Sequence, residues 1–161
     1  MFALLNRFRR SERGVAAIEL ALVTPLFLML FLSAVELGHL IFYSIQIEKA
    51  LRSAATYAGR HTAIDAATIT GTQNLARTNT VDGSGSWVVP GYASGATVNV
   101  TTQLYSGTGF TQLVVVVKVK VPYVPLVPDF VPALQAFAGG SQVKGGPYYI
   151  NLTHQQAMIG N

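Results

Sequence analysis

The chain of 161 residues contains no cysteine. This excludes disulfide frameworks, thiolate metal sites and cysteine nucleophiles, although an oxidising compartment stays compatible with the sequence. Charged residues are scarce as well: they form 11% of the chain, less than half of the roughly 25% that is usual in soluble globular proteins. Together with 50% hydrophobic residues and a mean hydropathy of +0.40, this shortage of charge points to a membrane. The length allows one membrane segment plus one small domain, and it excludes a large multidomain enzyme.

Most of the net charge lies in a short basic head. Residues 1–14 contain a single acid, Glu12, against four arginines: Arg7, Arg9, Arg10 and Arg13. This head therefore accounts for three of the four net positive charges of the chain. Because the basic balance belongs to one end and not to a distributed surface, we predict no nucleic-acid partner.

A long apolar run follows the basic head. Residues 15–35 read VAAIELALVTPLFLMLFLSAV, and their only ionisable side chain is Glu19. At ~1.5 Å per residue a helix of this length spans about 30 Å, which is the hydrocarbon thickness of a bilayer. We predict one transmembrane helix over about 15–37. The arginines on its N-terminal flank predict a cytoplasmic N-terminus and an extracytoplasmic remainder by the positive-inside rule.

Two residues mark positions along this transmembrane helix, a kink and its outer end. Pro25 frees the carbonyl group of Ala21, so a local kink or loosening is expected there. Glu36 lies about 31 Å along the helix axis from Val15 at the usual rise, and it is predicted to mark the outer edge of the membrane.

Helical spacing continues beyond the membrane, to about residue 62. The apolar positions that repeat at this spacing are Leu40, Tyr43, Ile47, Leu51, Ala54 and Ala58. Glu48 and Arg52 are expected to pair on another face. The four-residue spacing of Ala50, Ala54 and Ala58 has two readings: it allows helices to approach closely, or it reflects helix propensity alone.

The remainder, residues 63–161, is predicted to form a β-rich domain. Residues 68–95 are rich in Thr, Gly, Ser and Asn, and DGSGS at 82–86 is expected to be a loop. Residues 97–105 and 110–121 alternate apolar and polar positions around SGTG, which predicts a β-hairpin. In its second strand, Val115, Val117, Val119 and Val121 are expected to be buried, whereas Lys118 and Lys120 lie on the wet end of the other face. YYINLTH is a candidate final strand, and the predicted fold class is α+β.

Enzyme signatures are missing from the sequence. There is no GxSxG, HExxH, Walker loop or GxGxxG motif. His61 and Asp65 could share a helix face as metal ligands, but two candidates do not make a metal site, and a solvated surface pair is favoured. We therefore predict no catalytic residue, no metal site, no cofactor and no enzymatic activity.

Glu19 is the most informative single residue. A carboxylate inside a transmembrane run costs about 2.5–3.5 kcal/mol, so it needs a partner, a proton or a function. If the chain were cut after Gly14, the new ammonium group of Val15 would lie one helical turn from Glu19, or from the Glu19 of a neighbouring subunit. Such a pair would remove the penalty and fix the axial register between helices. The alternative is a neutral glutamic acid near the interface.

These residues resemble the processing site of type IV prepilins, in which a basic leader ends in glycine and a glutamate stands at the fifth position of the following apolar helix. The chain is most similar to the TadE-like minor pseudopilins of the tight-adherence (Tad/Flp) pilus system. The resemblance spans roughly residues 10–63. The matching residues are Gly14–Glu19, Pro25, Glu36–Gly38, Ala50–Ala55 and Tyr57–Ala58. TadE-like proteins often have phenylalanine or tyrosine where this chain has Leu20, and the major pilins of the system, which favour tyrosine there, are much shorter than this chain.

The resemblance implies cleavage between Gly14 and Val15 by a membrane aspartic prepilin peptidase, with N-methylation of Val15 as a further step. In this reading Gly14 is the required small residue, the arginines hold the site at the cytoplasmic face, and Glu19 sets the register. The implied partners are the bacterial inner membrane, the prepilin peptidase, and other pilins and pseudopilins with their assembly machinery. The protein would be a structural or assembly subunit, in the inner membrane or in the pilus.

Two other readings remain open. The chain could be an unprocessed single-pass protein whose helix anchors a binding or adhesion module. It could also be a secreted protein with an ordinary signal peptide, but no A-x-A cleavage site precedes Glu36.

Overall fold

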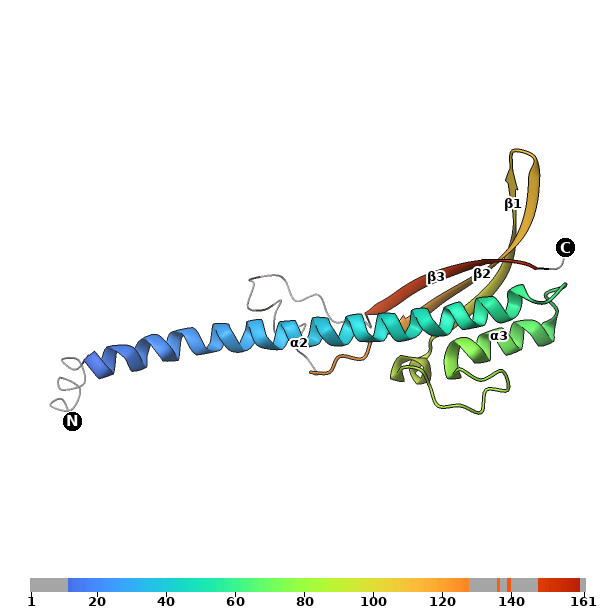
Figure 1. The fold of residues 1–161 in the computed structure, drawn as a ribbon. Coiled ribbons are helices and arrows are strands. Elements are labelled where there is room, and N and C mark those ends of the chain that lie inside the picture. The colour runs from blue at the N-terminus through green and yellow to red at the C-terminus, as the bar shows by residue number, and fades with distance from the viewer. Residues whose placement is uncertain (1–11, 128–135, 137–138, 140–147, 160–161) are drawn as a thin grey trace. The chain divides into compact units, whose positions relative to one another are not determined.

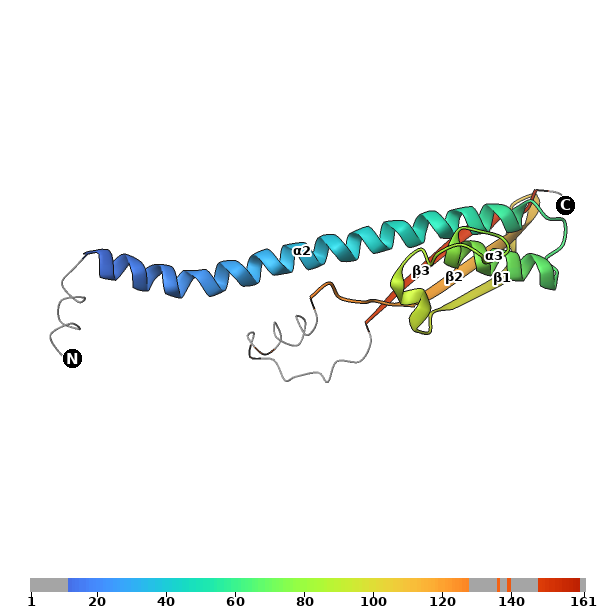
Figure 2. The same ribbon diagram turned by 90° about the horizontal axis from the view of Figure 1, so that it is seen from below.

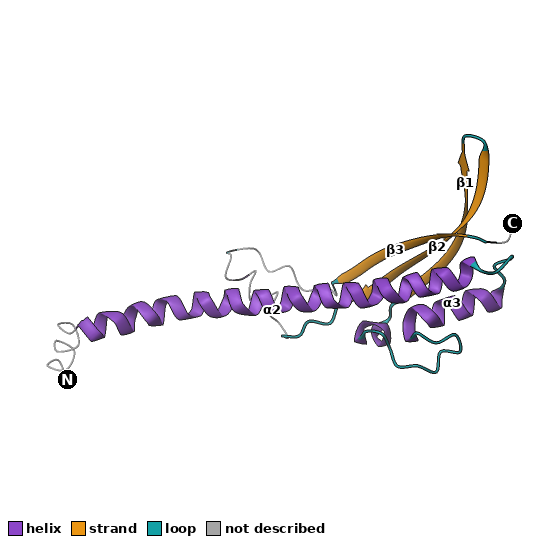
Figure 3. Ribbon diagram, viewed as in Figure 1, coloured by secondary structure: helices purple, strands orange, loops and turns teal. Residues whose placement is uncertain are grey.

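The computed structural model describes residues 12–127, 136, 139 and 148–159. The chain forms two compact units, Met1–Gly38 and His39–Asn161. The elements run in the order α2 (Glu12–Gly59), α3 (Ala66–Thr78), the short 3₁₀ helix η1 (Pro90–Ser94), β1 (Thr97–Gly107), β2 (Phe110–Pro122) and β3 (Tyr149–Ala157), as Figures 1 and 3 show. The predicted α+β class is confirmed: a long apolar helix precedes a small antiparallel sheet.

The second unit contains a three-stranded antiparallel sheet in the order β1-β2-β3. The predicted hairpin is confirmed, and its ladder runs from Thr97 opposite Lys120 to Gly107 opposite Phe110. The first strand continues two residues beyond the predicted end, because Thr108 and Gly109 alone connect the two strands. Gly109 has a φ of 87°, the positive value that a type II turn needs at its second central residue. The candidate final strand is confirmed as β3, which pairs with the other edge of β2.

The core of this unit lies between one face of the sheet and helix α2. Val115, Val117, Val119 and Val121 of β2 are at most 3% exposed, as the alternation predicted. The same hydrophobic cluster contains four residues of the predicted helix face, each at most 1% exposed: Ile47, Leu51, Ala54 and Ala58. The regularly spaced alanines Ala54 and Ala58 therefore serve the packing of this helix on its own sheet. Figure 2 shows the sheet alongside the C-terminal part of α2.

Helix α3 was not predicted, since the region from residue 63 onward was expected to be β-rich. Asp65 begins the helix, since its side-chain oxygen accepts a hydrogen bond from the Thr68 amide at 2.7 Å. The same hydrogen bond lowers the pKa of Asp65. His61 bonds to the Tyr57 carbonyl at 2.9 Å and lies outside both helices, so His61 and Asp65 do not share a helix face.

The sequence of α3 does not look helical, because threonine and glycine have low helix propensity. Thr70 and Thr72 donate their hydroxyl groups to the carbonyls four residues earlier, at 2.9 and 2.6 Å, and thereby fit into the helix. Gly71 permits a close approach to α2, because a Cβ atom there would lie 3.0 Å from the Tyr57 hydroxyl oxygen. Helix α2 itself ends at Gly59 and not at residue 62 as expected, since Arg60 and His61 form a turn before Asp65 begins the next helix.

The β1–β2 hairpin extends beyond β3. Strand β3 pairs with β2 only from Val114 to Pro122, so the hairpin residues nearest the turn have no third strand beside them. Leu104, Tyr105 and Phe110 are 58–67% exposed there, and the rings of the last two stack at 6.4 Å. The hairpin therefore ends in an uncharged, partly aromatic tip.

We expect Leu51→Ala to lower the free energy of unfolding of the second unit by about 2–5 kcal/mol, because it leaves a cavity between helix and sheet. Leu104→Ala is the matched control: Leu104 is 67% exposed, so its loss should cost below about 0.5 kcal/mol. Denaturant titration of the full chain in detergent micelles measures both. Equal destabilisation by the two variants would contradict the assignment of the core.

Candidate functional site

The N-terminal part of α2 has an apolar surface that the rest of the described protein does not cover. Of the described residues, only α2 is long and apolar enough to span a membrane, and no residue of its most apolar window is buried. Its large exposed side chains include Ile18, Leu20, Leu22, Phe27, Leu28, Leu30 and Phe31, which are 56–74% exposed. A core helix of a soluble protein would bury such side chains. This segment thus has the surface of a single-pass membrane anchor.

The environment of α2 changes along its length. Val15, Leu26 and Leu37 are about half exposed, whereas Ile47 and Leu51 are buried in the core of the second unit. Polar side chains in the apolar part form hydrogen bonds with the helix backbone: the Thr24 hydroxyl donates to the Leu20 carbonyl at 2.6 Å. One helix therefore supplies both an apolar outer surface and one wall of a folded core.

The predicted processing and register residues lie at the beginning of α2. Gly14 and Val15 occupy its first turn, and Glu19 follows one turn later. Val15 is 51% exposed and Glu19 is exposed too. Because residues four apart share a helix face, the backbone nitrogen of Val15 and the Glu19 carboxylate belong to the same side of the helix. Pro25 lies inside the helix, which continues on both sides of it.

The remaining predicted residues are placed as follows. Arg7, Arg9 and Arg10 lie outside the described residues, and only the backbone of Arg13 is described, within α2. Glu36 is on α2 and is 7% exposed. Its role as a membrane boundary stays a prediction.

An aromatic cluster lies at the start of the second unit. His39 and Tyr43 lie one turn apart with ring centroids at 4.2 Å, and Tyr123 joins them through a 3.2 Å contact between its hydroxyl oxygen and His39 Nδ1. Phe42, the neighbour of Tyr43 in α2, is 55% exposed. Tyr123 follows β2 and was not identifiable beforehand, because its contact with α2 bridges residues far apart in sequence. The cluster fastens the end of β2 to the helix.

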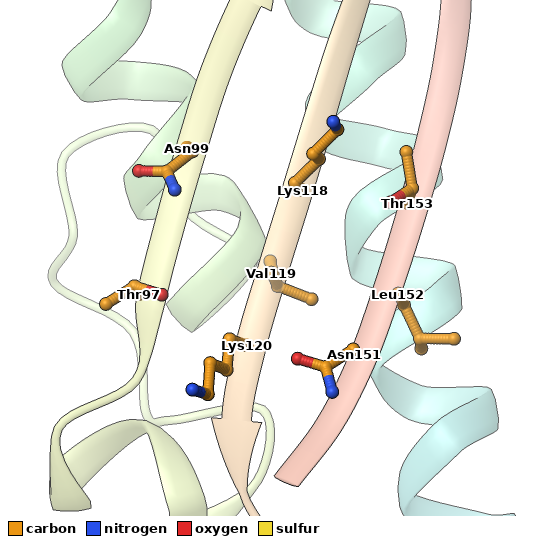
Figure 4. A pocket seen from close by; sticks show the side chains of 8 residues that line it. All are labelled: Thr97, Asn99, Lys118, Val119, Lys120, Asn151, Leu152 and Thr153. Atoms are coloured by element: carbon orange, nitrogen blue, oxygen red, sulfur yellow. The ribbon is translucent and has the colours of Figure 1, made fainter.

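The outer face of the sheet carries a polar groove of about 200 Å³. Its floor is the central strand, from which Lys118 and Lys120 project. Residues directly opposite them on the edge strands supply the two walls: Asn99 and Thr153 flank Lys118, and Thr97 and Asn151 flank Lys120. Figure 4 shows both lysines on this face and the two helices behind the sheet on the other side. Both lysines are exposed, as predicted. The groove itself could not be predicted, because it depends on β3 pairing with β2, and the sequence does not reveal that pairing.

Lys120 has a defined position in this groove. Its ammonium nitrogen lies 4.2 Å from the centroid of the Tyr149 ring, which is a cation–π contact. Within the described residues, no three His, Asp or Glu side chains lie close enough together to hold a metal ion.

These features define the class of the protein: an apolar helix with the surface of a membrane anchor, continuing into a small α+β unit. Residues 14–56 match the family model of TadE, described as TadE-like protein. The resemblance to the TadE-like proteins of Tad pilus systems is thereby confirmed over these residues, which are most of α2. No curated protein and no solved structure matches the chain. The TadE-like family is a family of pilus components and is not known as an enzyme family.

If the apolar segment is a membrane anchor, a charge near its middle should hinder integration. We expect Leu28→Arg to make insertion less favourable by about 3 kcal/mol, whereas Leu28→Ala, which shortens the same side chain without adding charge, should insert normally. The fraction of protein that resists alkaline extraction from membranes measures this. Equal integration of both variants would contradict the anchor.

Proposed function

We propose that this protein is a minor pseudopilin of a Tad/Flp pilus, processed after Gly14 and acting as a structural or assembly subunit. The observation that carries the proposal is the TadE-like match over residues 14–56, which coincides with a helix that is apolar and bare in one part and built into a folded unit in the other. A subunit that leaves the membrane to join a helical bundle needs both properties on one element.

Processing would act on the first turn of α2. The peptide bond between Gly14 and Val15 lies within the helix, so a peptidase needs this turn to unwind. Glycine lowers the cost of unwinding, because it disfavours the helix by about 1 kcal/mol relative to alanine. In this proposal the leader is residues 1–14, its arginines hold the site at the cytoplasmic face of the inner membrane, and residues 63–161 form the extracytoplasmic domain.

Cleavage would also change the electrostatics around Glu19. It removes a leader with a net charge of +3 and creates an ammonium group on Val15, one turn from the Glu19 carboxylate. An opposite charge nearby offsets the cost of keeping a carboxylate in the apolar segment. Pairing with the ammonium group of an adjacent subunit would align the two helices along their axes. The partners in this proposal are the prepilin peptidase and the other pilins and pseudopilins of the system.

The first test is the N-terminus of the mature protein. We expect the N-terminal sequence and intact mass to begin at Val15 in cells with a prepilin peptidase, and at Met1 in cells without it. A chain that keeps residues 1–14 in both strains would overturn the proposal in favour of an unprocessed, membrane-anchored adhesion module. An N-terminus beyond Ala34 would instead indicate secretion.

The second test concerns the register. Glu19→Ala should leave membrane insertion intact, because it removes a charge from the apolar segment, but it should reduce the number of assembled pili. Glu48→Ala is the matched control on the same helix: its ion pair with Arg52, at 3.1 Å, is exposed and contributes below about 1 kcal/mol. Unchanged piliation in the Glu19→Ala strain would argue against the register role.

A further inference from the structure

We propose that the groove on the outer face of the sheet binds an extended acidic segment of another protein. The groove is formed by Lys118 and Lys120 with their four cross-strand neighbours. This inference does not depend on processing after Gly14, because it rests only on the second unit.

The groove has a positive charge that nothing in the sheet balances. Lys118 and Lys120 project from the same face of β2 at alternate positions, and both are exposed. None of the three strands contains an aspartate or glutamate. Two adjacent like charges without a counter-charge destabilise the sheet slightly, so their presence on an otherwise uncharged face favours a binding role.

The spacing of the two lysine positions along β2 suits an extended chain. Alternate residues of a strand are about 6.5–7 Å apart, and side chains at alternate positions point to the same side. An extended ligand with carboxylates at every second residue has the same spacing, so it could place one carboxylate at each lysine. The contact of Lys120 with the Tyr149 ring limits the freedom that this side chain would lose on binding.

The walls of the groove favour a polypeptide over other polyanions. Asn99 and Asn151 lie on opposite walls, and each side-chain amide offers two donors and an acceptor. A peptide backbone supplies matching N–H and C=O groups, whereas a phosphate polymer supplies acceptors only. An anionic polysaccharide is the remaining competitor, and the test below includes it.

The occupant is not a second copy of this chain. The seven acidic residues of the sequence include no two at alternate positions. Those described in the second unit are already engaged: Glu48 pairs with Arg52, Asp65 caps α3, and Asp82 accepts hydrogen bonds from Ser84 at 2.9 and 3.2 Å. The complementary surface therefore belongs to a different protein.

The test is fluorescence anisotropy on the full chain in detergent micelles. The probe is a labelled peptide of alternating Glu and Thr, compared with a peptide of the same composition in which the residues alternate in pairs. We expect the alternating peptide to bind more tightly, with an affinity that falls as salt is added. Lys118→Gln together with Lys120→Gln should weaken its binding by roughly tenfold or more.

Lys49→Gln is the matched control, since Lys49 is an exposed lysine of the same unit on α2, and it should change the affinity less than about twofold. The thermal midpoint of the double variant should change little, because relief of the repulsion between the two exposed lysines and loss of the Lys120 contact with Tyr149 are both small and act in opposite directions. A charge-reversed variant, Lys118→Glu with Lys120→Glu, should gain affinity for a peptide of alternating Lys and Thr. This gain keeps the test decisive even if the first variant is less stable than expected.

Three results would overturn the proposal: no binding of the alternating peptide, an equal loss with Lys49→Gln, or tighter binding of polygalacturonate than of the peptide. None of them would alter the expected N-terminus at Val15, so failure of this inference and failure of the proposed function are distinguishable.

Discussion

The second unit depends on the packing of small side chains of α2 against the valine face of β2. Ala54, Ala55 and Ala58 are completely buried, and they belong to the same hydrophobic cluster as the valines of β2. Val115 and Val117 of that cluster have no exposed surface either. Larger helix residues at these positions would push the sheet away, since protein interiors tolerate little overpacking. The edge strands, α3 and the aromatic cluster are all arranged around this contact.

The same contact explains how one helix can face two different environments. Before residue 39 the helix has apolar side chains on every side and no protein around most of them, whereas from Ile47 onward its apolar residues are restricted to the face that the sheet covers. Both segments gain free energy when their apolar side chains leave water. A lipid bilayer would cover the side chains of the first segment, and valine side chains of the sheet cover those of the second. The polar groups of the outer sheet face are left to water and to ligands, because the helices pack on the other side of the sheet.

Structure that depends on residues close together in the sequence could be predicted, whereas contacts between residues far apart in the sequence could not. The membrane helix, its buried face and the β1–β2 hairpin follow from periodicities of 3.6 and 2, which are local. Helix α3 was missed because its threonines and Gly71 have low helix propensity, and their stabilising contacts with Tyr57 and Asp65 are not visible as a pattern. Gly14, Val15 and Glu19 lie close together in the sequence, so a processing site could be predicted there, and it stays a prediction. The groove instead needs Asn151 and Thr153, which lie beside Lys118 and Lys120 only through strand pairing.

The position of β3 in the sheet has a consequence for biosynthesis. This strand is synthesised after α2, α3, β1 and β2, yet it pairs with the central strand along its length and contributes Ile150 to the same core as α2. Until it arrives, one edge of β2 and part of the alanine-lined helix face have no covering. The core of the second unit is therefore completed only after β3 has been made. Between the synthesis of β2 and that of β3 the unit would expose an unpaired valine-rich strand, so a delay in that interval would favour aggregation.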